Sequence, residues 1–426
     1  MHRPLPSRSR RAHLFVGAGL LALGLLWGAC RPAVAPQNSV VSPTSAHVAS
    51  AAAAQLPVAT HTATVTITPT VTPSGTVTAT VTATASATRT LSPTSTATAM
   101  PLPAVVASYP IDGDRSVPPD AALVLVLERP IDPAQVTATF ILTPTLTGEV
   151  SWLDAQRVRF TQTEMITDTR YTLRFTLAAR ADASQAQVTK EITFSVGNRG
   201  APIPILMYHQ IMELSLEAEQ GIRDWVVPPA HLEEQLAYLA AHGFHNVNAD
   251  RVVAYLRDRE PLPPQPIVIS MDDGYRTVYT VARPLLQKYG FTASLFVQSG
   301  RAENSGFLSW EHMRTLRDEG YYLGSHSIDH PDLLAVEPAE VLRQVRDSKA
   351  AIETNVGQPV TVFCYPLGKH NAALISLLQE EGYEAAVSLN PGYYQYRGVY
   401  GLFQLARIWI YYDMTLEQFA AKLPPH

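Results

Sequence analysis

Helix-like and strand-like segments alternate along the chain from Ala201 onward, and this alternation constrains the fold more than any other feature. Pro229–His242 and Pro338–Asn355 carry apolar residues at helical spacing, whereas Thr292–Val297 and Tyr383–Ser388 are short apolar segments typical of buried strands. Parallel strands need a crossover connection, which is usually a helix. Repeated βα units over about 225 residues therefore predict a mostly parallel sheet that closes into a barrel.

Two polar motifs follow strand-like segments of this region. Ser270–Gly274, which contains Asp272 and Asp273, comes after an apolar run, and His326–Pro331 follows a second run. Carboxyl ends of parallel strands meet at one edge of a barrel, so we expect the two motifs to lie together. An Asp/His/His set with an open position is a recurring catalytic site for divalent ions, and here it leaves one carboxylate free to handle a proton.

The first thirty residues have the pattern of a targeting segment. Basic residues precede the apolar run Leu14–Ala29, which is short for a membrane span and matches the apolar region of a signal peptide. Cys30 ends the run, behind Gly-Ala, and resembles the lipidated cysteine of bacterial lipoproteins. Lipidation of Cys30 would anchor the protein to the bacterial membrane; cleavage or retention in an uncleaved anchor are the alternatives. The only other cysteine is Cys364, which excludes an internal disulfide framework.

Two further regions separate this segment from the barrel. Residues 31–104 are rich in Thr, Ala, Val, Pro and Ser, and Arg89 is the only charged residue between Pro32 and Pro110, so we expect a disordered stalk. Residues 105–198 contain short alternating strand patterns, including Leu123–Leu127, and resemble bacterial Ig-like surface modules. A spacer is the simpler role for this module, and weak carbohydrate contact is the alternative.

Residues 199–426 resemble the polysaccharide deacetylases of carbohydrate esterase family four. Ser270–Gly274 and His326–Pro331 match the first two motifs of that family, and Phe363–Gly368 stands in the place of the third. Pro204–His209 and the Tyr365–Gly368 part of the third motif are similar to the branch that deacetylates poly-β-1,6-N-acetylglucosamine in biofilms. The resemblance implies an α/β fold: a distorted (β/α) barrel catalytic domain, preceded here by a small all-β Ig-like sandwich and a disordered stalk.

The resemblance also implies roles for individual residues. The metal ligands would be Asp273, His326 and His330, holding zinc, with cobalt or nickel as alternatives. Asp272 would be the general base, and a backbone N–H near Leu367 would help to stabilise the oxyanion. The family's late Leu-x-His motif is replaced by Leu405-Ala406-Arg407, so His209 becomes the candidate general acid, with an ordinary buried histidine as the alternative. Tyr365, Pro366 and Arg407 are candidates for substrate binding, and Arg407 alternatively orients Asp272.

These roles predict an exported, cell-surface enzyme that removes N-acetyl groups from an N-acetylglucosamine polysaccharide. Peptidoglycan deacetylation and O-acetyl ester cleavage would use the same residues and stay open. A catalytically inactive carbohydrate-binding protein is the rival from another class, because the family's usual third-motif arginine is absent and Arg407 replaces the histidine of the late motif. The formal net charge is −5 and no basic stripe is present, so no nucleic-acid partner is expected. Five tyrosines are candidates for stacking on sugar rings, although ordinary packing is the simpler role: Tyr393, Tyr394, Tyr396, Tyr411 and Tyr412.

Overall fold

The computed structural model describes residues 101–180, 187–215 and 220–425. The predicted signal peptide, Cys30 and nearly all of the predicted stalk lie outside these residues and stay predictions. Within the described residues, every helix is too short or too polar to cross a membrane.

The first domain is a sandwich of two antiparallel sheets. One sheet has the order β1-β2-β5-β4, and the other has the order β3-β6-β7. Along β6, Tyr171, Leu173, Phe175 and Leu177 are fully buried while the residues between them are more exposed, as expected for sheets with one face on a shared core. The bounds are β1 Val105–Tyr109, β2 Leu123–Leu127, β3 Val136–Thr143, β4 Gly148–Trp152, β5 Arg157–Gln162, β6 Arg170–Ala179 and β7 Gln187–Ser195.

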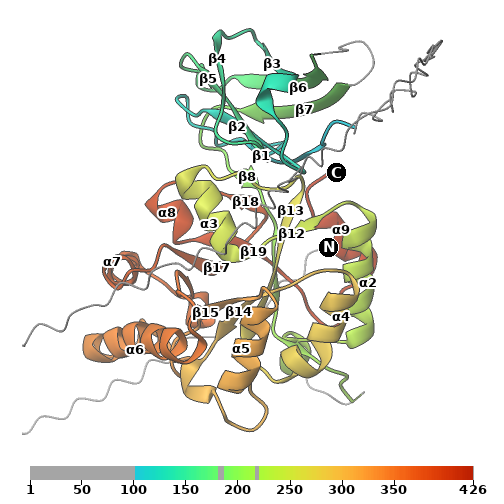
Figure 1. Ribbon diagram of the computed structural model, residues 1–426. Coiled ribbons are helices and arrows are strands. Elements are labelled where there is room, and N and C mark those ends of the chain that lie inside the picture. The colour runs from blue at the N-terminus through green and yellow to red at the C-terminus, as the bar shows by residue number, and fades with distance from the viewer. Residues whose placement is uncertain (1–100, 181–186, 216–219, 426) are drawn as a thin grey trace, which may run out of the picture. The chain divides into compact units, whose positions relative to one another are not determined.

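The second domain is a parallel barrel, which confirms the expected α/β fold (Figure 1). Among the described residues, seven strands follow one another around the barrel, and β9 closes it by pairing with both β19 and β13. The barrel is therefore one strand short of the eight-stranded form. The bounds are β9 Ile205–Tyr208, β13 Pro266–Asp273, β14 Ser294–Val297, β15 Tyr322–Ser325, β16 Val362–Cys364, β17 Ala385–Pro391 and β19 Leu405–Trp409; the short β12, His245–Asn246, pairs with β13 from outside the ring.

Helices connect these strands and begin at recognisable sequence signals. Asn371 caps α7 by accepting a hydrogen bond from the Leu374 N–H, and Ser309 and His312 form a capping box at the start of α5. The long α6 begins at a proline and ends before Gly357, whose φ of 74° suits glycine. The main helices are α2 Pro229–Ala241, α3 Ala249–Asp258, α4 Arg283–Lys288, α5 Trp310–Asp318, α6 Pro338–Val356, α7 Ala372–Glu380 and α9 Leu416–Ala421. Shorter elements are β8 Ala201–Pro202, β10 Gln210–Ile211, α1 Gln220–Arg223, β11 Val226–Val227, β18 Tyr394–Gln395 and α8 Val399–Leu402.

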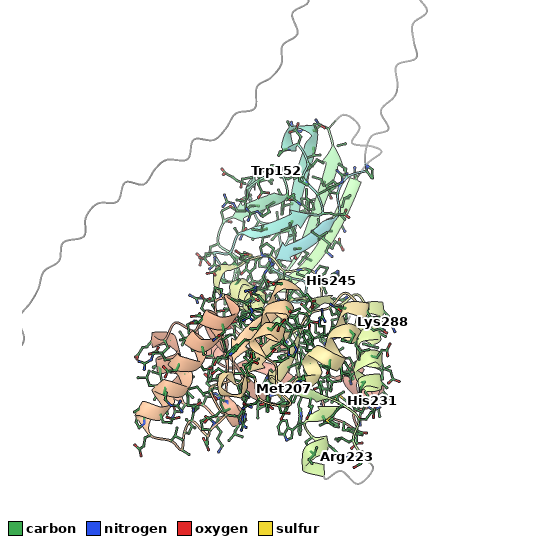
Figure 2. The ribbon with its side chains drawn as sticks, turned by 60° about the horizontal axis from the view of Figure 1, so that its bottom comes forward. Trp152, Met207, Arg223, His231, His245 and Lys288 are labelled. Carbon is green, nitrogen blue, oxygen red and sulfur yellow. The ribbon has the colours of Figure 1, made fainter. Side chains whose placement is uncertain are left out.

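The barrel strands are buried on both faces, so their sequences are nearly continuous apolar runs. Strand β13 is buried from Pro266 to Asp272, and its polar residues gather near its carboxyl end. Met207 of β9, labelled in Figure 2, is also buried. A buried carboxylate at the end of an apolar strand is unfavourable unless it is paired, so Asp272 needs partners that compensate its charge.

A buried polar cluster joins the loop after β1 to the barrel domain. Asp114 is fully buried and accepts hydrogen bonds from the Tyr255 hydroxyl of α3 and from Arg397 Nη2, the latter at 3.2 Å. Arg397 also donates through Nε to the Ser116 carbonyl at 2.8 Å. The carboxylate of Asp114 therefore compensates a cation that has little access to water.

Asp114→Ala is expected to lower the free energy of unfolding by about 3–5 kcal/mol, because it leaves Arg397 buried without its counter-charge. Urea denaturation of the whole protein measures this value. Asp120→Ala is the matched control, since Asp120 forms an exposed ion pair with Arg259 at 3.1 Å and should contribute less than about 1 kcal/mol. Equal losses in the two variants would contradict a structural role for the buried cluster.

Candidate active site

A cavity of about 470 Å³ lies at the carboxyl ends of the barrel strands and contains both polar motifs. A larger cavity of about 710 Å³, around residues 390–406, is lined by tyrosines, amide and small residues and Arg397, and it has no carboxylate or histidine. The smaller cavity is therefore the candidate active site, as expected for a parallel barrel. The sequence-predicted residues that line it are His209, Asp272, Asp273, His326, His330, Tyr365, Leu367 and Arg407.

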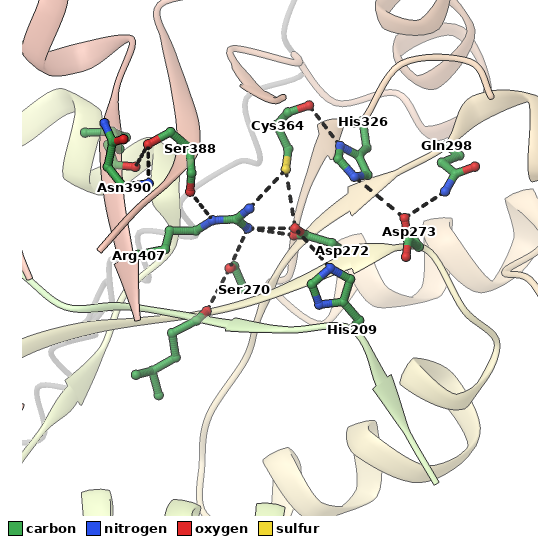
Figure 3. Close-up of polar contacts among 12 residues, drawn as sticks. His209, Ser270, Asp272, Asp273, Gln298, His326, Cys364, Ser388, Asn390 and Arg407 are labelled. Atoms are coloured by element: carbon green, nitrogen blue, oxygen red, sulfur yellow. Dashed lines mark hydrogen bonds and ion pairs between the residues drawn. The ribbon is translucent and has the colours of Figure 1, made fainter. Parts of the chain in front are cut away.

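Three of these residues form a cluster suited to a metal ion. One ligand atom from each of Asp273, His326 and His330 lies within 4.8 Å of the others. His326 Nδ1 lies 2.9 Å from the Cys364 carbonyl oxygen, which can only accept, so Nδ1 carries the proton and Nε2 presents its lone pair toward Asp273, 3.6 Å away (Figure 3). Gln298 Nε2 donates to Asp273 Oδ1 at 2.7 Å. Ligand groups held by such outer contacts fit a divalent cation with mixed nitrogen and oxygen preference.

Left-handed backbone conformations occur in both motifs, at or next to the three candidate metal ligands. Ser327 and His330 have φ values of 63° and 64°, and Asp273 has a φ of 69°, all in the left-handed region that non-glycine residues seldom occupy. Hydroxyl groups hold the turn: Ser327 Oγ accepts from the His330 N–H at 3.0 Å, and Ser348 Oγ donates to the Ser327 carbonyl at 3.0 Å. Strained backbone of this kind concentrates at functional sites, where surrounding contacts maintain it.

Asp272 is separate from the metal cluster and is paired with a buried arginine. Arg407 Nη1 donates to both carboxylate oxygens at 2.8 Å, and Arg407 Nε donates to the Ser388 carbonyl at 2.9 Å (Figure 3). Asp272 and Arg407 are only 1% and 3% exposed. Burial by itself raises the pKa of Asp272, but Arg407, followed by His209 and His326, outweighs it and holds the pKa below its ordinary value. The carboxylate is thus kept ionised.

Asp272, His326 and Cys364 form a second compact group of ligand types. The Arg407 guanidinium occupies this space, since Arg407 also lies 3.4 Å from the Cys364 sulfur. Burial raises the pKa of the Cys364 thiol well above its usual range, so the sulfur is not a thiolate. The Asp273, His326 and His330 cluster is therefore the better candidate for a metal site, and metal binding by it stays a prediction.

His209 lies beside Asp272 at the end of β9. Its Nε2 is 3.9 Å from Asp272 Oδ2, and its ring packs edge-on against Trp225 with 4.7 Å between ring centroids. Its Nδ1 is buried and has no hydrogen-bond partner among the described residues. Burial lowers the pKa of His209, and the nearby Asp272 and Asp273 oppose this only in part. A neutral imidazole with a lowered pKa becomes a stronger acid once it is protonated.

The third-motif residues occupy one wall of the cavity. Leu367 has a φ of 59° and a side chain that is 49% exposed. Tyr365 lines the cavity, but it is only 1% exposed: its hydroxyl donates to the Phe403 carbonyl at 3.1 Å and its ring stacks on His370. Pro366 is buried and is not among the lining residues. The roles of these three residues stay predictions.

Seven lining residues are not among the sequence-predicted site residues: Trp225, Tyr275, Gln298, Arg301, Asp329, Gly368 and Leu389. Gln298 directly follows β14, so the rule that places polar residues at strand ends also applies to it. Tyr275 follows Gly274 in the first motif. Trp225 lies in a loop between short elements, where no local pattern marks it.

Comparisons with known proteins agree with this geometry. Residues 259–386 match the polysaccharide deacetylase family, and residues 99–196 match the bacterial Ig-like domain. YxkH of Bacillus subtilis (strain 168), named for the same family, is 28% identical over 192 residues, which are 45% of this chain and 66% of that protein.

More distant relatives were also found. The poly-beta-1,6-N-acetyl-D-glucosamine N-deacetylase of Staphylococcus aureus is 19% identical over 206 residues, covering 43% of this chain and 71% of that protein. The solved structure of the Streptococcus pyogenes deacetylase PplD in complex with acetate aligns with 53% of this chain and 100% of its own, at 26% identity and a TM-score of 0.49. The two family matches together show that this chain carries a polysaccharide deacetylase domain preceded by a bacterial Ig-like domain.

Proposed function

We propose that this protein is a metal-dependent hydrolase that removes N-acetyl groups from an N-acetylglucosamine-containing polysaccharide at the cell surface. The observation that supports it most strongly is the pairing of an Asp/His/His cluster with a separate, ionised carboxylate in one cavity. The name of the S. aureus relative supports a poly-N-acetylglucosamine substrate.

The residues of the cavity have complementary roles in this proposal. Asp273, His326 and His330 would hold a divalent ion, which supplies Lewis-acid polarisation and lowers the pKa of water. Asp272 takes the proton of the attacking water, because it is ionised and lies at the cavity wall. The water oxygen adds to the amide carbon, and the backbone N–H near Leu367 donates to the oxyanion. His209 then takes this proton from Asp272, whose Oδ2 lies 3.9 Å from its Nε2, and gives it to the nitrogen as the C–N bond breaks, which releases acetate and a free amine.

The contact between Arg407 and Asp272 argues against the alternative in which the domain is catalytically inactive and only binds carbohydrate. That alternative rests on the missing third-motif arginine, with Cys364 nearest its place, and on Arg407 in place of the late-motif histidine. Arg407 supplies a guanidinium to Asp272 from strand β19, so the base has a cationic partner. The active-enzyme proposal is therefore favoured over a purely carbohydrate-binding role.

Acetate release from β-1,6- and β-1,4-linked N-acetylglucosamine oligomers tests the proposal. Release from the β-1,6 series would favour a biofilm polymer, and release from the β-1,4 series would favour the cell wall or a related polymer. A preference for O-acetylated sugars would select the ester-cleaving alternative. No acetate from any of these substrates, despite bound metal, would overturn the enzyme proposal. Cys30 lipidation and export remain part of the proposal and are tested by radiolabelled lipid incorporation in a bacterial host.

Metal removal is expected to abolish acetate release, and addition of Zn²⁺ should restore it, with Co²⁺ and Ni²⁺ as the comparison ions. His330→Gln should weaken metal binding by at least about tenfold, because it removes one of three protein ligands. Metal analysis and acetate assays on the same samples measure both effects. His245→Gln is the control, since His245 is an exposed residue of β12. Full activity in metal-free protein would contradict the proposed metal site.

A further inference from the structure

A row of aromatic side chains begins at the active-site cavity and continues past the end of β19. Trp225 packs against His209, Trp409 lies next to Trp225 at 5.4 Å between ring centroids, and Tyr411 lies next to Trp409 at 5.7 Å. Trp225 and Trp409 are 42% and 40% exposed. Two neighbouring indoles with this much exposed surface are not explained by the core, and such patches mark binding surfaces.

Polar contacts of neighbouring residues hold this row of rings in place. Trp409 Nε1 donates to the Asp224 carbonyl at 2.9 Å. Arg223, labelled in Figure 2 on helix α1, pairs with Asp413 at 2.7 Å and lies over the Tyr412 ring at 4.3 Å from its centroid. These contacts link the loop that carries Trp225 to the segment that follows Trp409. Rings fixed before a ligand arrives lose little conformational freedom when they bind it.

A second groove accompanies the row. This cavity of about 480 Å³ is lined by Trp409 and Tyr411 together with Met207, Tyr393 and Lys422. It shares Leu389 and Arg407 with the active-site cavity, so the two hollows have a common wall. Trp225 lines the first cavity and packs against Trp409, which lines the second, so a ligand that leaves the first cavity along these rings would meet the second one.

We propose that Trp409, Tyr411 and this adjoining groove form a subsite for sugar units beyond the one that is deacetylated, so that the protein selects long chains. The inference rests on the proposed function for the identity of the sugar. Pyranose rings present apolar C–H faces that stack on aromatic rings, while the groove's polar groups meet the hydroxyls at the ring edges. A row of exposed aromatic rings that runs from one cavity to the next suits a polymer better than a single sugar.

Binding and turnover of N-acetylglucosamine oligomers in the whole protein test this subsite. Trp409→Ala should raise the Kd for a hexasaccharide about tenfold and lower the ratio of hexasaccharide to disaccharide kcat/KM by a similar factor. Trp409→Phe keeps an aromatic face and should recover most of both values. Tyr400→Ala is the control, because Tyr400 is 67% exposed and lines neither of these two hollows but the separate cavity of about 710 Å³. Melting temperatures establish that each variant is folded.

The outcomes separate this inference from the proposed function. Unchanged hexasaccharide affinity in folded Trp409→Ala would overturn the subsite, whatever the acetate assay gives. Hexasaccharide binding that depends on Trp409 without acetate release from any oligomer would support the subsite and overturn the deacetylase proposal. An equal loss in Tyr400→Ala would also contradict the subsite, because it would show a general effect of removing exposed rings.

Discussion

Asp272→Asn is expected to lower kcat for acetate release by about 10³-fold, within the range for removal of a positioned general base. An asparagine amide cannot accept the proton of the attacking water near neutral pH. It still offers an oxygen to Arg407, and the ligands Asp273, His326 and His330 are unchanged. Metal content should therefore stay close to that of the wild-type protein while turnover is lost. Steady-state acetate release and metal analysis of the same preparation measure the two quantities.

Asp318→Asn is the control for this variant, because Asp318 pairs with Arg317 on the surface of α5. It should retain wild-type turnover. A melting curve of Asp272→Asn distinguishes a lost base from a lost fold, since the substitution also removes half of a buried ion pair. Turnover within a few fold of wild type in Asp272→Asn would assign the base role to another group, and His209 would be the next candidate.

The barrel and the metal cluster were predictable because they depend on local patterns. Apolar runs that end in polar residues place Asp272 and His326 at the same edge of a parallel sheet, whatever the details of the helices. Helix α3 is not among the elements predicted above, although Val252, Val253 and Leu256 have helical spacing within it. The apolar spacing of this segment is therefore sufficient to predict the helix from the sequence.

Strand β19 is a different case. Its apolar pattern is interrupted by Arg407, and a buried arginine within a strand is unfavourable unless a carboxylate compensates it. The compensating residue, Asp272, is 135 positions away in the sequence. The pairing therefore depends on barrel closure, which local sequence patterns do not specify. For the same reason the sequence left two roles open for Arg407, and Trp225 could not be connected with His209.

Arg407→Met is expected to have the second large effect, on stability and on the pH dependence of activity. Without the guanidinium, Asp272 is a buried carboxylate without its main counter-charge, which costs about 3–5 kcal/mol of unfolding free energy. Burial, which raises the pKa, is then opposed only by the histidines, so the pKa of Asp272 should rise. The acidic limb of the kcat/KM profile should move to higher pH. Arg407→Lys keeps the charge but loses the Nε–H that donates to the Ser388 carbonyl, and it should show a smaller change.

The contribution of Asp272 to the pH dependence of stability should reverse its sign in Arg407→Met. In the wild-type protein the folded pKa of Asp272 is lowered, so its stabilising contribution is present above the unfolded pKa of about 4 and is lost as pH falls through the folded pKa. If the pKa in Arg407→Met is raised above the unfolded value, stability instead falls as pH rises from the unfolded pKa of about 4 through the raised folded pKa. Urea denaturation at several pH values measures the slope. An unchanged slope and an unchanged acidic limb would show that Arg407 does not control Asp272.

The double variant Asp272→Asn/Arg407→Met separates the charge pair from simple packing. Removing one partner leaves a buried charge, whereas removing both leaves none, so the double variant should be more stable than Arg407→Met alone. Its activity should nevertheless stay as low as that of Asp272→Asn, because the base is absent. Stability that returns without activity would assign Arg407 the role of holding Asp272 ionised and in position. Additive losses of stability would mean that the two side chains contribute independently, and that the arginine does not replace the missing third-motif residue.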